Sequence, residues 1–339
     1  MLSLSLLLLL GAGAPAPQVQ IQPSSQEVRP VRIAATAFGR PAEIEVRDLP
    51  PDTARTAIQS ALAEIAEIER LTQPDTLNAG AGQGPHAVDP RLMPLLVRAQ
   101  EFCFWSEGAH GPLGRDLYEA WGLRGSSPTG GPAGAPDSER LERAKVAARC
   151  DSLRLNPSKG TAELAVGAQL DLGGFAEGHA VDRAVEVLRQ NGVANGFVQI
   201  GTVQRAFGGG ADGRGWKVML PTFAGMDRPA GRFLLRDRAA AVLSVEDTPL
   251  KIADQALLPY LHQRTGLPAP GVAGVAAVTD LAVDAQALAI AMALTGPREG
   301  QLRLGSLRPS PSVLWLLGNG SGAPLQVDHR WGEIIAASK

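Results

Sequence analysis

The sequence contains few of the residues and segments that mark the most common catalytic and nucleotide-binding motifs. Its 339 residues include two cysteines, five histidines and two tyrosines. The cysteines do not have a metal-binding spacing, and neither a G-x-S-x-G segment nor a P-loop is present. These absences disfavour a cysteine-based metal site, a serine hydrolase of the nucleophile-elbow type and a P-loop nucleotidase.

Charge of one sign is not in excess either. Charged residues make up 19% of the chain and the formal net charge is −2, so there is no electrostatic reason to expect nucleic acid as a partner. Hydrophobic residues make up 45%, which is enough for a sizeable core. No stretch beyond the N-terminus reaches the length of a membrane-spanning helix without charge, so we expect no transmembrane segment.

The N-terminus has the pattern of a secretory signal peptide. An apolar run over residues 6–10 is too short to span a bilayer, and small residues follow at 12–16. We expect residues 1–16 to be a signal peptide and residues 17–30 a linker, which predicts an exported, periplasmic protein. Because no basic residue precedes the run, a disordered start or a wrongly assigned start codon is the alternative.

The two cysteines, Cys103 and Cys150, could pair in an exported chain. They are far apart in sequence, and Cys103 lies in an apolar stretch. We therefore expect two buried free thiols.

Helical and extended segments are mixed along the chain without regular βαβ alternation. Apolar spacing predicts helices over residues 52–71, 89–102, 138–148, 176–191 and 281–295. Strand-like runs occur over residues 162–172, 196–201, 216–220, 232–244, 272–279 and 312–317. This pattern predicts an α+β fold with mixed, largely antiparallel sheets and packed helices. We expect one domain over residues 31–339, with a Gly/Pro-rich loop at 124–136.

The most informative segment is a glycine-rich turn that leads into the predicted helix at 176–191. Gly173, Gly174 and Gly178 let the backbone approach a neighbouring group closely. The helix begins beside these glycines, so its free N–H groups could face an anion such as a pyrophosphate. Tight packing within the protein is the alternative explanation of the same glycines.

The residues of this segment resemble the signature of the ApbE family, the FAD:protein FMN transferases. Beside the family pattern D-L-G-G-I-A-K-G-Y-A-V-D-R-A, the chain reads Asp171-Leu172-Gly173-Gly174-x-Ala176-x-Gly178-x-Ala180-Val181-Asp182-Arg183-Ala184. Partial matches occur in the family's order at residues 108–122, 216–221, 264–268 and 287–297. The resemblance implies an ApbE-like, T-fold-like core.

The resemblance also implies a reaction. Enzymes of this family transfer FMN from FAD to a Thr or Ser, here of an exported acceptor protein, with help from Mg²⁺. His262, at the position of a family Asp, is the candidate for proton transfer. The residues implied to contact FAD are Ala109, His110, Gly111, Gly173, Gly174, Glu177 and His179.

The metal ligands implied by the resemblance are only partly present. The family uses the carbonyl oxygen of the turn's Ala, here Ala176, with an Asp and a Thr that share one helix face. Gln286 and Ile290 stand at those two positions. Asp284 is the alternative to Gln286, although a first-turn carboxylate on a buried helix also explains it. A non-catalytic FAD-binding relative and a purely structural module are therefore the alternatives to an active transferase.

Overall fold

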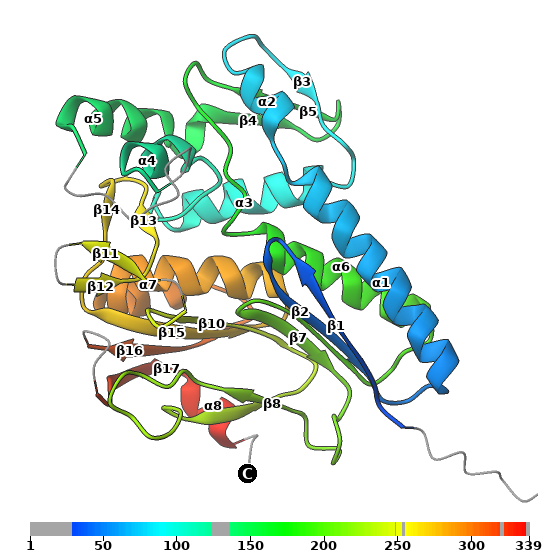
Figure 1. Cartoon of the computed structure of the whole chain (residues 1–339). Coiled ribbons are helices and arrows are strands. Elements are labelled where there is room, and N and C mark those ends of the chain that lie inside the picture. The colour runs from blue at the N-terminus through cyan, green and yellow to red at the C-terminus, as the bar shows by residue number, and fades with distance from the viewer. Residues whose placement is uncertain (1–28, 124–135, 248, 253–254, 319–321, 337–339) are drawn as a thin grey trace, which may run out of the picture.

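The fold of the computed structural model is organised around one eight-stranded sheet (Figure 1). Every neighbouring pair of its strands is antiparallel. From one edge to the other, the order is β1 (Val31–Ala37), β2 (Arg40–Val46), β6 (Gly196–Ile200), β7 (Val203–Phe207), β10 (Ala239–Ser244), β15 (Val272–Thr279), β16 (Ser312–Leu317) and β17 (Leu325–His329). With the helices described next, this sheet confirms the predicted α+β class.

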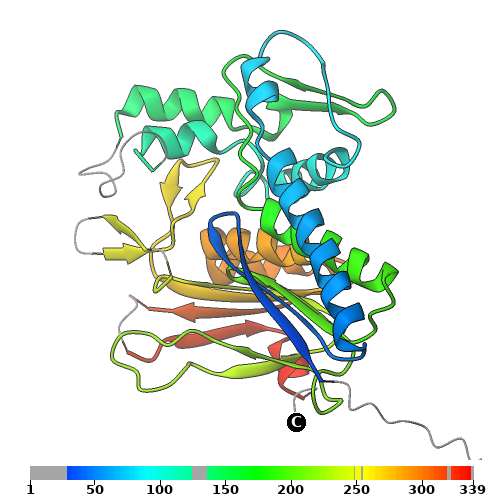
Figure 2. The ribbon, with the colours of Figure 1, turned by 45° about the vertical axis from the view of Figure 1, so that its right-hand side comes forward.

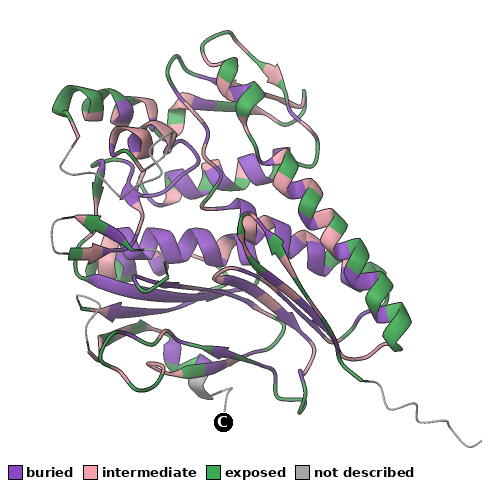
Figure 3. Cartoon of the chain, viewed as in Figure 1, coloured by how far each residue is buried: buried purple, intermediate pink, exposed green. Residues whose placement is uncertain are grey.

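Three long helices cover one face of the sheet: α1 (Pro51–Leu71), α6 (Ala176–Gln190) and α7 (Ala282–Leu304). Helix α6 lies between the other two and packs against both. The helical repeat of apolar residues in α1 is buried in this layer, as Figure 3 shows. Helix α7 is kinked at Gly296, before Pro297, so the predicted end at residue 295 marks the kink rather than the end of the helix.

A smaller group of elements lies above the helices in the view of Figure 1 and stays separate from the large sheet in Figure 2. It includes one three-stranded sheet with the order β3-β5-β4. Its elements are α2 (Asp75–Ala79), β3 (His86–Ala87), α3 (Met93–Trp105), α4 (Arg115–Ala120), α5 (Ser138–Ala147), the 3₁₀ helix Cys150–Ser152, β4 (Leu153–Asn156) and β5 (Thr161–Leu164). Asp137 caps α5 by accepting a hydrogen bond from the Arg140 amide.

The prediction of two free thiols was wrong. Cys103 and Cys150 form a disulfide, with their Cα atoms 5.7 Å apart. Their separation of 47 residues along the chain does not keep them apart, because the C-terminal end of α3 packs beside the 3₁₀ helix. The bond therefore joins two elements of the smaller group.

Short ribbons complete the fold and correct two predicted strands. The predicted strand at 162–172 ends at Leu164, and the one at 232–244 is divided by a turn in which Asp237 has a positive φ. The remaining elements are β8 (Trp216–Met219), β9 (Arg232–Leu235), β11 (Leu250–Ile252), β12 (Gln255–Leu257), β13 (Leu261–His262), β14 (Leu267–Pro268) and α8 (Trp331–Ala336).

The structure describes residues 29–123, 136–247, 249–252, 255–318 and 322–336. The predicted signal peptide lies outside the described residues, as do nearly all of the predicted linker and of the loop at 124–136. Within the described residues, no helix combines the length and the apolar character needed to cross a membrane.

Candidate functional site

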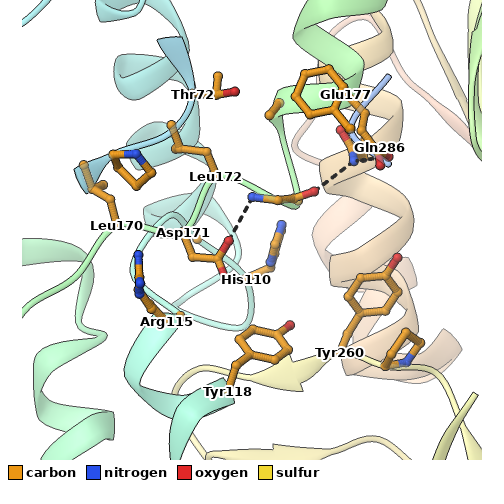
Figure 4. A pocket seen from close by; sticks show the side chains of 18 of the residues that line it. Thr72, His110, Arg115, Tyr118, Leu170, Asp171, Leu172, Glu177, Tyr260 and Gln286 are labelled. Atoms are coloured by element: carbon orange, nitrogen blue, oxygen red, sulfur yellow. Dashed lines mark hydrogen bonds between the residues drawn. The ribbon is translucent and has the colours of Figure 1, made fainter. Parts of the chain in front are cut away.

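A polar cleft of about 460 Å³ lies where the start of α6 meets α4, the tip of the β1–β2 hairpin and the loop before β13 (Figure 4). Five of the residues predicted to contact FAD line it, and two of those predicted to bind a metal do so as well. These are His110, Gly111, Gly173, Gly174 and Glu177 for FAD, and Ala176 and Gln286 for the metal. The structure thus brings together most of the predicted site.

The glycine-rich turn forms one wall of the cleft. The Asp171 carboxylate accepts a hydrogen bond from the amide of Gly173 at 3.0 Å, and the first residues of α6 follow directly. Gly178 faces α7 rather than a ligand. A Cβ atom at this position would lie 2.5 Å from the carbonyl oxygen of Ala282 in α7. The turn therefore holds the start of α6 at the cleft, while Gly178 lets α6 and α7 pack closely.

Gln286 connects α7 to this turn and is buried. Its side-chain oxygen accepts a hydrogen bond from the Gly178 amide at 2.8 Å. Its side-chain nitrogen donates to the carbonyl oxygen of Gly173 and to the carboxylate of Glu177, both at 3.1 Å. The amide is thus held by three bonds to the turn and to the first turn of α6.

Two titratable side chains in the cleft wall have pKa values shifted by burial. Burial raises the pKa of Glu177 to about 7, although the positive charge of Arg40 acts in the opposite direction. Burial lowers the pKa of His110 to about 4. The His110 ring stacks on Phe175, with the ring centres 4.8 Å apart. His110 is therefore neutral at pH 7, and one face of its ring is already covered.

Arg40 lines the cleft from the start of β2. The hairpin before it has a two-residue turn, and both turn residues, Phe38 and Gly39, have positive φ, as in a type I′ turn. The Arg40 side chain passes over Gly201, where a Cβ atom would lie 2.8 Å from its Nε. Arg40 forms no ion pair with any described residue, so its positive charge is available to a ligand. Arg40 was not predicted from the sequence, because it lies outside the motifs that resemble the family.

Both tyrosines of the chain, Tyr118 and Tyr260, line the cleft, and Figure 4 shows their rings on the side opposite Glu177. Gln263 lies beside them, and its side-chain nitrogen donates to the carbonyl oxygen of Gly111 at 2.7 Å. Aromatic rings offer flat surfaces on which a flavin or adenine ring can stack. Neither tyrosine belongs to a local pattern that would have connected it to a site.

Four predicted site residues are not among those that line the cleft. Ala109 is buried, and its carbonyl oxygen accepts a hydrogen bond from the backbone N–H of Gln263. His179 lies on α6 near the charges of Arg183 and Glu64. Asp284 points away from the cleft and binds Arg98 through two hydrogen bonds of 2.7 Å. His262 is buried in β13, and it is its neighbour Gln263 that lines the cleft.

The cleft and the sheet together define an antiparallel α+β protein with a polar, partly cationic pocket at the start of a helix. The sequence model of the ApbE family matches residues 38–312. The chain therefore belongs to the ApbE family.

Two curated relatives carry the description FAD:protein FMN transferase. The one from Treponema pallidum is 35% identical over 133 residues, which cover 37% of this chain and 35% of the relative. The one from Rhodobacter capsulatus is 26% identical over 278 residues, which cover 77% of this chain and 51% of the relative. The chain thus spans about half the length of these relatives or less.

Solved structures support the fold. A crystal structure of the ApbE protein from Thermotoga maritima has a TM-score of 0.80 at 20% identity, covering 92% of this chain and all of that one. The structure of the flavinyl transferase ApbE from Pseudomonas stutzeri has a TM-score of 0.76 at 18% identity, covering 90% of this chain and 96% of that one.

Proposed function

We propose that this protein is an FAD:protein FMN transferase whose donor site is the cleft at the start of α6. The observation that carries the proposal is that the cleft places a cation with no ion-pair partner among the described residues, a helix N-terminus and two tyrosine rings around one space. A dinucleotide with a pyrophosphate between two aromatic ring systems presents the matching chemistry. Family membership and the described relatives agree with this choice.

The reaction is a phosphoryl transfer. The hydroxyl oxygen of an acceptor Thr or Ser forms a bond to the FMN phosphorus, and the bond from that phosphorus to the bridging oxygen breaks, so that AMP leaves. The hydroxyl proton passes to a base, and the carboxylates of Asp171 and Glu177 are the candidates in the cleft wall. His262, the candidate suggested by the sequence, would have to act from outside that wall. The protein's contribution is to orient the donor and to balance its charge.

The side chains in place do not fit a resident Mg²⁺ ion. Mg²⁺ prefers an octahedral shell of oxygen ligands that includes carboxylates. Among the described residues, no group of three or more His, Cys, Asp or Glu side chains could hold a metal ion. Asp284 is occupied by Arg98, and the Gln286 amide by its bonds to the turn. No step of the reaction is therefore assigned to a bound metal.

We also propose that the protein acts after export, on an acceptor protein in the periplasm. The apolar run and small residues within 1–16 support a signal peptide. The Cys103–Cys150 disulfide supports an oxidising compartment. Cell fractionation with N-terminal sequencing of the mature chain tests this. An intact N-terminus on protein found in the cytoplasm would contradict it.

The activity can be tested without first identifying the acceptor. The purified protein is incubated with FAD and with the exported proteins of cells that lack this chain. We expect AMP release and a fluorescent flavin band that survives denaturing electrophoresis. A Tyr118→Ala, Tyr260→Ala double variant should lose both signals. Phe104→Ala, at an exposed aromatic residue outside the cleft, should retain them.

The absence of AMP and of covalent flavin, with Mg²⁺, with Mn²⁺ and with EDTA, would contradict the transferase. Binding of FAD without either product would then identify the chain as a non-catalytic flavin-binding relative. If FAD does not bind at all, only the structural role is left.

A further inference from the structure

The face of α7 that points at the glycine-rich turn carries an amide and an alkyl group. Gln286 and Ile290 lie four residues apart, which places them on one side of the helix. Ile290 reaches the turn, because a Cβ atom on Gly174 would lie 3.2 Å from its Cδ1. The one carboxylate nearby on α7, Asp284, is turned toward Arg98. This face therefore offers neither a carboxylate nor a hydroxyl group to the cleft.

The amide of Gln286 is already used. Its oxygen holds the Gly178 amide, and its nitrogen, which has no lone pair for a metal, holds Gly173 and Glu177. A cation that took this oxygen as a ligand would have to displace or share the bond to the first turn of α6. That bond satisfies an N–H group that the helix itself leaves free. The neutral side-chain amide of Gln286 therefore fills the place where α6 and α7 meet.

Two arginines supply positive charge to the cleft. Arg40 and Arg115 both line it. Arg115 is committed to Glu119 at 3.1 Å and lies 3.7 Å from Asp75. Arg40 has no such partner among the described residues. Its charge acts on Glu177, Tyr260 and Asp247, which places it close to the start of α6.

We propose that Arg40 balances the pyrophosphate charge of the flavin nucleotide, and that donor binding in this chain therefore needs no resident divalent cation. The inference rests on the proposed FAD donor. A guanidinium forms strong, charge-assisted hydrogen bonds to phosphate oxygens, often two at a time. It can thus take over at the donor the neutralising role that a metal ion would have. Gln286, in turn, positions the helix start through its hydrogen bonds to Gly178 and Gly173.

The test measures FAD binding by the full chain through flavin fluorescence, without an acceptor. The dissociation constant should be the same, within about twofold, in EDTA and in Mg²⁺. Arg40→Gln should raise it by about ten- to a hundredfold, the scale of a lost charge-assisted hydrogen bond. Arg40→Lys should restore part of the affinity. Riboflavin, which lacks the phosphates, should respond to Arg40→Gln by less than about threefold.

Two further variants keep the result unambiguous. Arg32→Gln, which removes an exposed arginine on β1 outside the cleft, should leave FAD binding unchanged. Gln286→Asp combined with Ile290→Thr should create a response to Mg²⁺, tightening FAD binding by about tenfold. Titration calorimetry with Mg²⁺ alone, before FAD is added, should detect binding to this double variant and not to the unmodified chain.

Three results would overturn the inference while leaving the proposed function intact. The first is FAD binding to the unmodified chain that EDTA abolishes. The second is an equal loss of FAD and riboflavin affinity in Arg40→Gln. The third is a double variant that ignores Mg²⁺, which would show that this face of α7 is not where a cation would act. If the unmodified chain does not bind FAD under any condition, the proposed function fails instead.

Discussion

The buried imidazole of His110 makes a quantitative prediction about stability and pH. An exposed histidine has a pKa of about 6.5, and burial lowers the pKa of His110 in the folded protein to about 4. Between these two values the unfolded chain takes up a proton at this residue and the folded chain does not. The titration of His110 therefore leaves the free energy of unfolding unchanged above about pH 6.5. It lowers this free energy as the pH falls toward 4.

The size of the effect follows from the two pKa values. The difference corresponds to about 3 kcal/mol of unfolding free energy over this range. Because the side chain is only 6% exposed, solvent screening does not reduce this value much. His179, whose pKa burial also lowers to about 4, adds a loss in the same direction, so the comparison must isolate His110.

The assay is urea unfolding at a series of pH values from 8 to 4, for the unmodified chain and for His110→Phe. Phenylalanine keeps a ring against Phe175 and cannot take up a proton. The two proteins are compared first at pH 8, which gives the packing cost of the substitution. As the pH falls, the gap between them should then shift by about 3 kcal/mol in favour of the variant. A constant gap, or an NMR titration that puts the pKa of His110 near 6.5, would refute the reasoning.

Three further outcomes follow from packing and pairing. Gly178→Ala forces a Cβ atom against the α7 backbone, so it should cost about 2 kcal/mol or more in urea unfolding, whereas Gly305→Ala, which meets nothing closer than 3.6 Å, should be nearly neutral. Asp182→Asn should cost about 3 kcal/mol in the same assay, because it leaves the partly buried charge of Arg205 unpaired; an unchanged unfolding midpoint would contradict this. Cys150→Ser opens a 47-residue loop and should cost about 4 kcal/mol, and a reductant should destabilise the unmodified chain equally while leaving the variant unaffected.

Much of the fold could be predicted because local patterns agree with tertiary packing. The apolar spacing of α1 and α6 is the buried face of each helix, so their limits were predicted to within one or two residues. The strand at 162–172 was extended too far, because Ala168, Leu170 and Leu172 are buried in irregular structure, beyond an exposed turn that contains Val166. The disulfide was missed because it depends on the packing of α3 beside a short 3₁₀ helix, and no local pattern encodes that.

The site was predictable where it is made of consecutive residues. The turn from Gly173 to Glu177 was found because its glycines and the helix start are adjacent in sequence. Arg40 and the two tyrosines reach the cleft from three separate segments, through a hairpin tip, a short helix and a loop. Only the folded chain shows that these residues share one space. The direction of Asp284 likewise depends on Arg98, almost two hundred residues earlier.

The disulfide also supports one wall of the cleft. A Cβ atom on Gly111 would lie 2.5 Å from the sulfur of Cys103, so the bond packs directly behind the wall that Gly111 and Gln263 form through their hydrogen bond. While the chain is in a reducing compartment the bond cannot persist, and this wall lacks its support. Under the export proposed above, the bond would form, and support this wall, only after the chain has left the reducing compartment in which it is made.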